Sequence, residues 1–302
     1  HAAARSPSGR STQTIGVVLP DVHGEFFSEL IRGVDSLARA SGRHLLLSSY
    51  HGDPGEQAAP LRAVRGRVDG LLVMSPYAEP PGSLAENLPQ LPVVLISTQQ
   101  DEPAWPVFEI DNHAGAVAMT RHLLSLGHRH IASLAGPDHN HDARDRLRGS
   151  REATPAQDGA RGSEFAGDFG EASGHRAGGG ILAAAERPDA VFAANDMMAL
   201  GCLYAFAQAG WAVPRDIALA GFDDIPLARF VHPSLTTMRV SIAELGATAL
   251  KRLLAQIEAG EAAVAERHVL TPELVIRQSS GGDSIGKKRE AAAATKKKSA
   301  NR

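Results

Sequence analysis

The residues best suited to binding chemistry in this 302-residue chain stand directly after short apolar runs. Asn195 and Asp196 interrupt the apolar segment "VFAANDMMALGCL" (191–203), and Asp223 follows "IALAGF" (217–222). An amide offers donors and an acceptor, and a carboxylate can accept from two hydroxyls, so both suit a hydroxylated ligand. We predict that Asp196 caps the helix after it, because its oxygen can accept N–H groups of the first turn. For Asn195, a ligand contact and a second capping role remain equally open.

Three further side chains could complete such a site. Arg144, in "HDARDRLRG", is the predicted positive partner, and the alternative is a solvated helix face, because Arg146 and Arg148 cannot all point inward with it. Phe169 could supply a flat apolar wall for the ring of a ligand, or it could belong to the core. Ser75 ends another apolar run, "GLLVMS".

The elements that must position these residues alternate regularly along the chain. Short, mostly continuous apolar runs are typical of strands buried on both faces of a parallel sheet. They occur at 15–20, 44–50, 70–75, 92–97, 107–111, 130–136, 190–194 and 217–222. Helical patterns lie between them at 25–42, 114–128 and 197–210, and a last long helix is predicted at 241–260. The fold class is therefore α/β with parallel sheets, and the number of strands favours two sheets in two domains. Ligands of such sheets bind at the carboxyl ends of the strands.

Composition and missing motifs exclude several classes of function. The net charge of −3 provides no basic field for nucleic acid or a membrane surface. We find no glycine-rich nucleotide motif and no nucleophile elbow, so we predict no cofactor and no catalytic residues. The histidines around 128–141 match no zinc spacing, so we predict no metal site. The single cysteine, Cys202, and the lack of a signal-peptide core at the start favour a cytoplasmic protein.

Two segments are poor in large aliphatic residues. The stretch 150–180 is rich in glycine and is expected to be mobile or irregular, because Gly178 to Gly180 weaken any helix there. The basic, low-complexity end at 280–302 predicts a disordered tail.

In their order and spacing, seven motifs resemble the LacI/GalR family of bacterial transcription regulators. They are "QTIGVVLPDVHGEFFSELIRGVD", "RVDGLLVMSP", "LLSLGHRHIASLAGP", "PDAVFAANDMMALG", "VPRDIALAGFDDIPLARF", "HPSLTTMR" and "LTPELVIRQSS". The resemblance runs from about Thr14 to Ser279. The resemblance implies a periplasmic-binding-protein-like core of two Rossmann-like subdomains joined by three crossovers. It places the N-terminal subdomain at 14–126 plus 242–268, and the C-terminal subdomain at 127–239 plus 269–278. The effector of such proteins, usually a sugar or a sugar derivative, lies between the subdomains.

The resemblance also implies roles for particular residues. Arg144, Asn195 and Asp223 correspond to hydroxyl-binding groups, Phe169 to an aromatic wall, and Ser75 and Phe27 to contacts on the N-terminal side. Family members form homodimers. The implied dimer interface uses Leu200, Cys202, Phe206, Leu227 and Val231.

One departure from the family concerns the beginning of the chain. Family members begin with a helix-turn-helix domain and a hinge helix, and residues 1–13 correspond only to a remnant of the hinge. Pro7 stands where the family usually has a leucine that enters the DNA minor groove, and a proline disfavours a helix there.

The leading hypothesis is therefore the effector-binding and dimerisation core of a repressor, which would reach operator DNA through a domain upstream of residue 1. The alternative is a secreted sugar-binding protein of an uptake system, which shares the fold. A sugar-modifying enzyme is disfavoured because no catalytic constellation is found.

Overall fold

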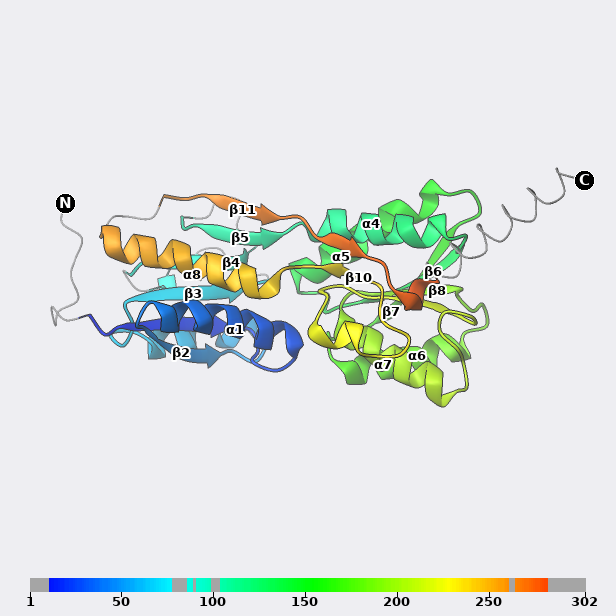
Figure 1. The fold of residues 1–302 in the computed structure, drawn as a ribbon, viewed down its shortest axis with the longest axis horizontal. Coiled ribbons are helices and arrows are strands. Elements are labelled where there is room, and N and C mark those ends of the chain that lie inside the picture. The colour runs from blue at the N-terminus through cyan, green and yellow to red at the C-terminus, as the bar shows by residue number, and fades with distance from the viewer. Residues whose placement is uncertain (1–10, 78–85, 89–90, 99–103, 261–263, 282–302) are drawn as a thin grey trace, which may run out of the picture. The chain divides into compact units, whose positions relative to one another are not determined.

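The computed structural model describes residues 11–77, 86–88, 91–98, 104–260 and 264–281, and the statements below concern these ranges (Figure 1). The chain divides into two compact units. Unit 1 comprises residues 1–111, 139–142 and 241–270, and unit 2 comprises residues 112–138, 143–240 and 271–302. Apart from the short segment 139–142, the chain passes between the units three times, which confirms the predicted α/β fold of two subdomains with three crossovers.

The first crossover lies one helix earlier than the sequence-based boundary at 126/127. Helix α4 (Asn112–Ser125) belongs to unit 2, where it packs against β8, β10 and β12, whose bounds are given below. Gly115 allows this packing, because a Cβ there would lie 2.8 Å from the Phe222 ring and 3.1 Å from the Pro272 ring. The helical pattern predicts the existence of α4 but not the sheet that it covers. At the third crossover, unit 1 extends to Leu270, two residues beyond the predicted limit of 268.

Unit 1 is built on a six-stranded parallel sheet with the order β11-β5-β4-β3-β1-β2. Its strands are β1 (Thr14–Leu19), β2 (His44–Ser49), β3 (Gly70–Ser75), β4 (Val93–Thr98), β5 (Val107–Ile110) and β11 (Arg267–Leu270). Its helices are α1 (Glu25–Ala40), α2 (Ala58–Ala63), α8 (Ile242–Ala259) and the short η1 (Pro54–Glu56). Every residue of β3 and β4 is buried, which explains why these strands are continuous apolar runs rather than alternating ones.

Helices α1 and α8 of unit 1 lie side by side (Figure 1). Two glycines permit their close approach: a Cβ on Gly33 would overlap the Ala243 carbonyl, and one on Gly246 would lie 2.6 Å from the Leu30 oxygen. Backbone therefore meets backbone at this contact. Any larger residue at either position would force the two helices apart.

Unit 2 has a four-stranded parallel sheet with the order β7-β6-β8-β9 and an antiparallel pair, β10-β12. Its strands are β6 (His130–Ala135), β7 (Arg161–Ala166), β8 (Ala190–Ala193), β9 (Ala218–Ala220), β10 (Thr237–Arg239) and β12 (Glu273–Val275). With α4, its helices are α5 (His141–Ala153), α6 (Glu171–Ala183), α7 (Asp196–Gln208) and the short η2 (Thr154–Ala156), η3 (Pro226–Arg229) and η4 (Gln278–Ser280).

The glycine-rich stretch 150–180 is ordered, so the expectation of irregular structure is wrong. Strand β7 pairs with β6 along its whole length, and α6 runs through all three glycines at 178–180. Gly174 shows why glycine is used in this segment: a Cβ there would overlap the backbone of Met198 on the adjacent α7. The lack of large side chains lets α6 and α7 pack closely. The predicted tail lies outside the described residues from 282 onward.

Candidate functional site

In unit 2, polar groups lie at one edge of the sheet, namely the edge formed by the carboxyl ends of its parallel strands. Strands β6, β8 and β9 are parallel neighbours, so their carboxyl ends point the same way. Asn195 follows β8, and Asp223 follows β9. Helix α5, which follows β6, adds an arginine to this edge. The sequence-based prediction of a polar cluster at this edge agrees with this topology.

The arginine at this edge is Arg146, not the predicted Arg144. Its Nη1 lies 3.3 Å from Asp223 Oδ1 and donates to the Ala194 carbonyl at 2.6 Å, while its Nε donates to Asn112 Oδ1 at 2.7 Å. The Arg146 side chain is 6% exposed, whereas Arg144 is an exposed residue. The structure therefore replaces Arg144 by Arg146 in the candidate site.

Helical spacing explains the difference between the two arginines. The inward face of α5 carries Ala143, Arg146, Ser150 and Ala153, all of them buried and three or four residues apart. Arg144 lies on the opposite face. The small residues at this spacing are the signal that could have identified Arg146 from the sequence, because they mark the side that packs on the sheet.

Aromatic rings flank the guanidinium of Arg146. Its carbon lies 3.9 Å from the centroid of the Phe222 ring and 5.9 Å from that of the Phe169 ring. Such stacking holds the plane of the guanidinium in one orientation. Phe169 thus lies beside Arg146 and also packs against the core of unit 2, so both interpretations of Phe169 from the sequence stay open.

Asn195 has a structural role that accounts for both of its polar atoms. Its Oδ1 accepts from Met198 N at 3.0 Å, which makes it the N-cap of α7, and its Nδ2 donates to the Phe169 carbonyl at 2.9 Å. The predicted cap, Asp196, is instead the first residue of the helix. Asn195 therefore caps α7 and holds the backbone of Phe169, and its predicted contact with a ligand stays a prediction.

Asp196 is fully buried beneath this edge. Its carboxylate accepts from Thr237 Oγ1 at 2.6 Å and from Ile225 N at 2.9 Å. Burial, followed by the charge of Asp223, raises the pKa of Asp196 well above its usual value. Its two hydrogen bonds attach α7 to Ile225, in the segment after β9, and to Thr237, the first residue of β10. Asp196 is thus a structural support.

The backbone at the site adopts conformations that L-residues rarely take. Phe169 has φ 71°, Asp223 has φ 112° and Asp224 has φ 57°. A backbone hydrogen bond from Asp223 N–H to the Met238 carbonyl, at 2.8 Å, stabilises this conformation of Asp223. Asp224 is fixed by ion pairs with Arg239 at 2.7 Å and Arg277 at 2.5 Å. Strained non-glycine residues cluster at functional sites, where they aim a side chain.

The two predicted residues of unit 1 both lie at the carboxyl end of its own sheet. Ser75 ends β3, is 2% exposed, and its Oγ accepts from Gln57 Nε2 at 2.9 Å. Phe27 lies in the first turn of α1, is half-buried, and meets the Phe26 ring edge to face at 5.5 Å. The Ser75 hydroxyl is thus held in place by Gln57, and the Phe27 ring keeps part of its surface exposed.

Sequence reasoning missed an aromatic group at the same end of unit 1. The Tyr77 ring stacks on the His139 ring with centroids 4.9 Å apart, and it meets the Tyr50 ring edge to face at 6.2 Å. The pKa of the Tyr77 hydroxyl is raised, mainly by burial. The negative charge of Asp21 also raises this pKa, whereas a hydrogen bond with Asn140 lowers it. Nothing in the local spacing joins position 77 to position 139, because their contact depends on the tertiary fold.

The predicted dimer residues differ in whether they reach the surface. Cys202 and Phe206 are 0% exposed in the core of unit 2, and Cys202 Sγ donates to the Gly174 carbonyl at 3.2 Å. No partner could contact these two side chains, so their assignment to an interface is wrong. Leu227 is 41% exposed, whereas Leu200 and Val231 are half-buried. Phe230, which the prediction omitted, is 76% exposed.

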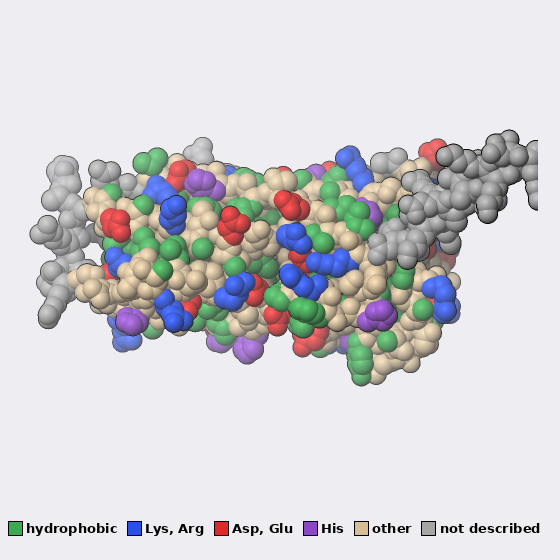
Figure 2. Space-filling view, viewed as in Figure 1, with side chains coloured by type: hydrophobic (Ala, Val, Ile, Leu, Met, Phe, Trp, Pro, Cys, Tyr) green, Lys and Arg blue, Asp and Glu red, His purple; other side chains and the backbone are tan. Residues whose placement is uncertain are grey.

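The described part of the chain offers neither a metal site nor a membrane span. There, no three His, Cys, Asp or Glu side chains converge as a metal site would require. No helix within these ranges is long and apolar enough to cross a bilayer. On the face shown in Figure 2, acidic and basic side chains are interspersed rather than gathered by sign.

Known proteins resemble this chain in sequence over most of its length. A family profile described as a periplasmic binding protein-like domain matches residues 120–280. The HTH-type transcriptional repressor PurR of Aliivibrio fischeri is 35% identical over 286 residues, which cover 92% of this chain and 84% of the repressor. PurR of Mannheimia succiniciproducens is 33% identical over 282 residues with the same coverage.

Solved structures of transcription regulators resemble this chain in fold. A lactose repressor bound to the anti-inducer ONPF has a TM-score of 0.80 at 27% identity, covering 88% of this chain and 99% of that one. A LacI family regulator from Enterococcus faecium with bound ribose has a TM-score of 0.78 at 28% identity, covering 88% and 98%. The regulator CelR in complex with cellobiose has a TM-score of 0.78 at 28% identity, covering 89% and 85%.

Two parallel-sheet units joined by three crossovers, with polar residues at the carboxyl ends of the strands, define a periplasmic-binding-protein-like ligand-binding domain. The chain belongs to the LacI/GalR family of transcription regulators, and it comprises the effector-binding core of such a regulator. The relatives are repressors, which favours the regulator over the secreted sugar-binding protein.

Proposed function

We propose that this chain binds a small hydroxylated effector of the sugar class, with the carboxylate of Asp223 and the guanidinium of Arg146 as its principal contacts in unit 2. The carboxylate accepts hydrogen bonds from ligand hydroxyls, and the guanidinium donates to a ring or hydroxyl oxygen. The observation that carries this proposal is the buried pair at 3.3 Å, built on an aspartate that is held at φ 112°. Burying two charges and straining the backbone both cost stability, and a ligand that uses them gives a reason for that cost.

Other groups complete the proposed contacts. Phe169 offers a ring face to the C–H groups of a sugar, and Asn195 keeps the backbone of Phe169 in place. Ser75 and Phe27 remain proposed contacts on unit 1. The ribose and cellobiose bound to two relatives support the sugar class for this chain.

The remaining partners follow from family membership. We propose that the chain forms homodimers through the surface around Leu227 and Val231, and that a domain upstream of it contacts operator DNA. Effector binding would then change operator affinity, and such couplings are typically about 1–3 kcal/mol. A repressor of this kind works in the cytoplasm and needs no catalytic group.

A thermal-shift screen with pentoses, hexoses and disaccharides tests the proposal, because a ligand that binds only the folded state raises the melting temperature. Calorimetry on the best sugar then compares Asp223→Asn with Arg144→Asn. We expect Asp223→Asn to weaken binding by at least about tenfold, because hydrogen bonds to charged groups are worth about 1.5–3 kcal/mol. The exposed Arg144 provides the matched control and should leave the affinity unchanged. Equal affinity in both variants would remove Asp223 from the site.

A further inference from the structure

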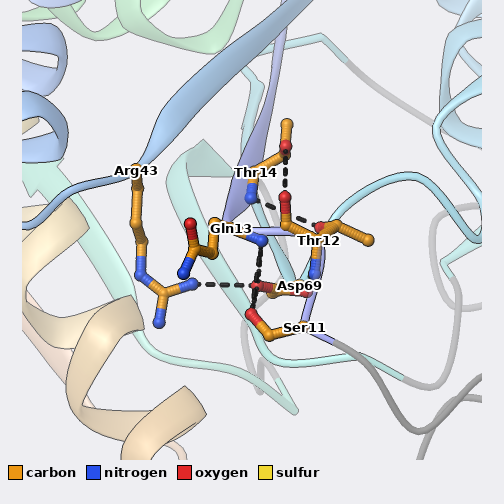
Figure 3. A network of polar contacts seen from close by, with 6 residues as sticks. All are labelled: Ser11, Thr12, Gln13, Thr14, Arg43 and Asp69. Carbon is orange, nitrogen blue, oxygen red and sulfur yellow. Dashed lines mark hydrogen bonds and ion pairs between the residues drawn. The ribbon is translucent and has the colours of Figure 1, made fainter.

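The N-terminal segment of unit 1 is bound to one carboxylate, that of Asp69 (Figure 3). Asp69 Oδ1 accepts from Thr12 N at 2.8 Å and Thr12 Oγ1 at 2.9 Å. Asp69 Oδ2 accepts from Ser11 Oγ at 2.6 Å, Gln13 N at 3.0 Å and Arg43 Nη1 at 2.9 Å. We name these five residues the Asp69 anchor. Three consecutive residues thus converge on one side chain that is distant in sequence.

The backbone of the segment is shaped for this contact. Gln13 has φ 51°, a conformation that costs energy for a residue other than glycine, and it lies directly before β1. Asp69 lies directly before β3 and donates its own N–H to the Thr14 carbonyl at 2.8 Å. The side chain of Asp69 is only 13% exposed, so water competes weakly for its oxygens. Residues 11–13 are themselves exposed, and so contacts with Asp69, rather than burial, fix their course.

The anchor lies at the opposite end of the unit 1 sheet from Ser75 and Phe27. Asp69 and Gln13 precede their strands, whereas Ser75 ends β3. Helix α1 connects the two ends: Phe27 is in its first turn, and Arg43 follows its last residue, Ala40, by three positions. Its 16 residues span about 24 Å at 1.5 Å per residue. Because α1 packs closely on α8, it behaves as a rigid link between the candidate contact Phe27 and the anchor.

We propose that the Asp69 anchor fixes the direction in which the chain joins unit 1, so that a domain upstream of residue 11 turns together with unit 1. The regulatory use of the anchor rests on the proposed function, since only a regulator would transmit an orientation upstream. If Asp69 did not hold residues 11–13, an upstream domain could swivel independently of unit 1.

Amide hydrogen exchange of the full chain, followed by NMR without any effector, tests the anchor. Asp69→Asn removes the charge and one acceptor. We expect exchange at Thr12 and Gln13 to accelerate by at least about tenfold, the effect of losing one charge-assisted hydrogen bond. Exchange at Ile15 and Val17, which lie within β1, should be unchanged. Ser11→Ala removes a single donor from an exposed residue and should give a smaller increase at the same two amides.

Asp35→Asn is the matched control, because Asp35 is a half-exposed aspartate of α1 paired only at long range with Arg39, at 3.9 Å. Tryptic cleavage between Arg10 and Ser11 gives a second measurement, since it requires local opening of residues 11–13. It should be faster in Asp69→Asn and unchanged in Asp35→Asn. Unchanged exchange at Thr12 and Gln13 in Asp69→Asn would overturn the proposal, and so would acceleration spread evenly over β1. Neither result bears on effector binding, which the sugar screen tests separately.

Discussion

At the scale of single residues, Arg146 and Asp223 depend on each other. Their side chains are 6% and 4% exposed, so each charge is compensated inside the protein rather than by water. Arg146 also satisfies the Ala194 carbonyl and the Asn112 amide oxygen. Removing one partner of such a buried pair leaves an uncompensated buried charge. The resulting loss of stability is larger than the net stability that the intact pair provides.

We therefore expect Arg146→Ala to lower the free energy of unfolding by about 3 kcal/mol. Urea denaturation followed by circular dichroism measures this. The same change at the exposed Arg144 should alter the free energy by less than about 0.5 kcal/mol. Equal losses in the two variants would show that Arg146 is not buried against Asp223.

The pH dependence of the Asp69 anchor follows from its hydrogen bonds. Burial tends to raise the pKa of Asp69, but the hydrogen bonds from Ser11, Thr12 and Gln13 outweigh it and lower the pKa below its usual 3.8. In the unfolded chain Asp69 titrates near the usual value, so its contribution to stability is present above about pH 4 and is lost as the pH falls through the lower folded value.

We expect the stability difference between the wild type and Asp69→Asn to be constant from pH 5 to 7 and to shrink below about pH 4. Thermal unfolding across this pH range measures the difference. A gap that stays constant down to pH 2 would mean that the carboxylate charge contributes nothing.

At the scale of elements, glycines decide how the helices of unit 2 pack. Gly174 and Gly179 both lie in α6, but only Gly174 faces α7, where a Cβ would overlap the backbone of Met198. Nothing lies within 4 Å of a Cβ built on Gly179, which is exposed.

Gly174→Ala should destabilise the protein by about 1–3 kcal/mol, because it overpacks the contact between α6 and α7. Gly179→Ala should stabilise it by about 0.5–1 kcal/mol, since alanine restricts the unfolded chain and favours the helix. Chemical denaturation of both variants compares the two positions. Similar effects of the same sign would contradict the packing assigned to α6.

Periodicity predicted the alternation of strands and helices because each buried strand is a continuous apolar run, as in β3 and β4. The prediction from sequence failed for Arg144, because the arginine that faces the sheet is the one on the inward side of α5, which is Arg146. It also failed for α6, whose many glycines read as an irregular segment although they serve its packing on α7. The positive φ of Asp223 and the contact of Tyr77 with His139 depend on the tertiary fold and have no local signal.

At the scale of the whole molecule, exposed apolar residues indicate where a second copy could bind unit 2. Phe230 is 76% exposed and follows Leu227 by three positions, whereas Cys202 and Phe206 are buried in the core. A large ring in water at such a position is typical of an interface.

Phe230→Asp should therefore shift the chain from dimer to monomer in sedimentation experiments without lowering its melting temperature. Val264→Asp, which places the same charge on an exposed apolar residue of unit 1, provides the comparison and should leave the dimer intact. If Phe230→Asp remained fully dimeric, the interface would have to lie elsewhere.

We propose that Asp223 and Arg146 bind the hydroxyl groups of an effector. A crystal structure of the chain with the best sugar from the thermal-shift screen tests it most directly. We expect a ligand hydroxyl within about 3 Å of an Asp223 carboxylate oxygen and a ligand oxygen at a similar distance from the Arg146 guanidinium. A sugar bound with full occupancy at a different place, with Asp223 and Arg146 contacting only protein groups, would contradict it.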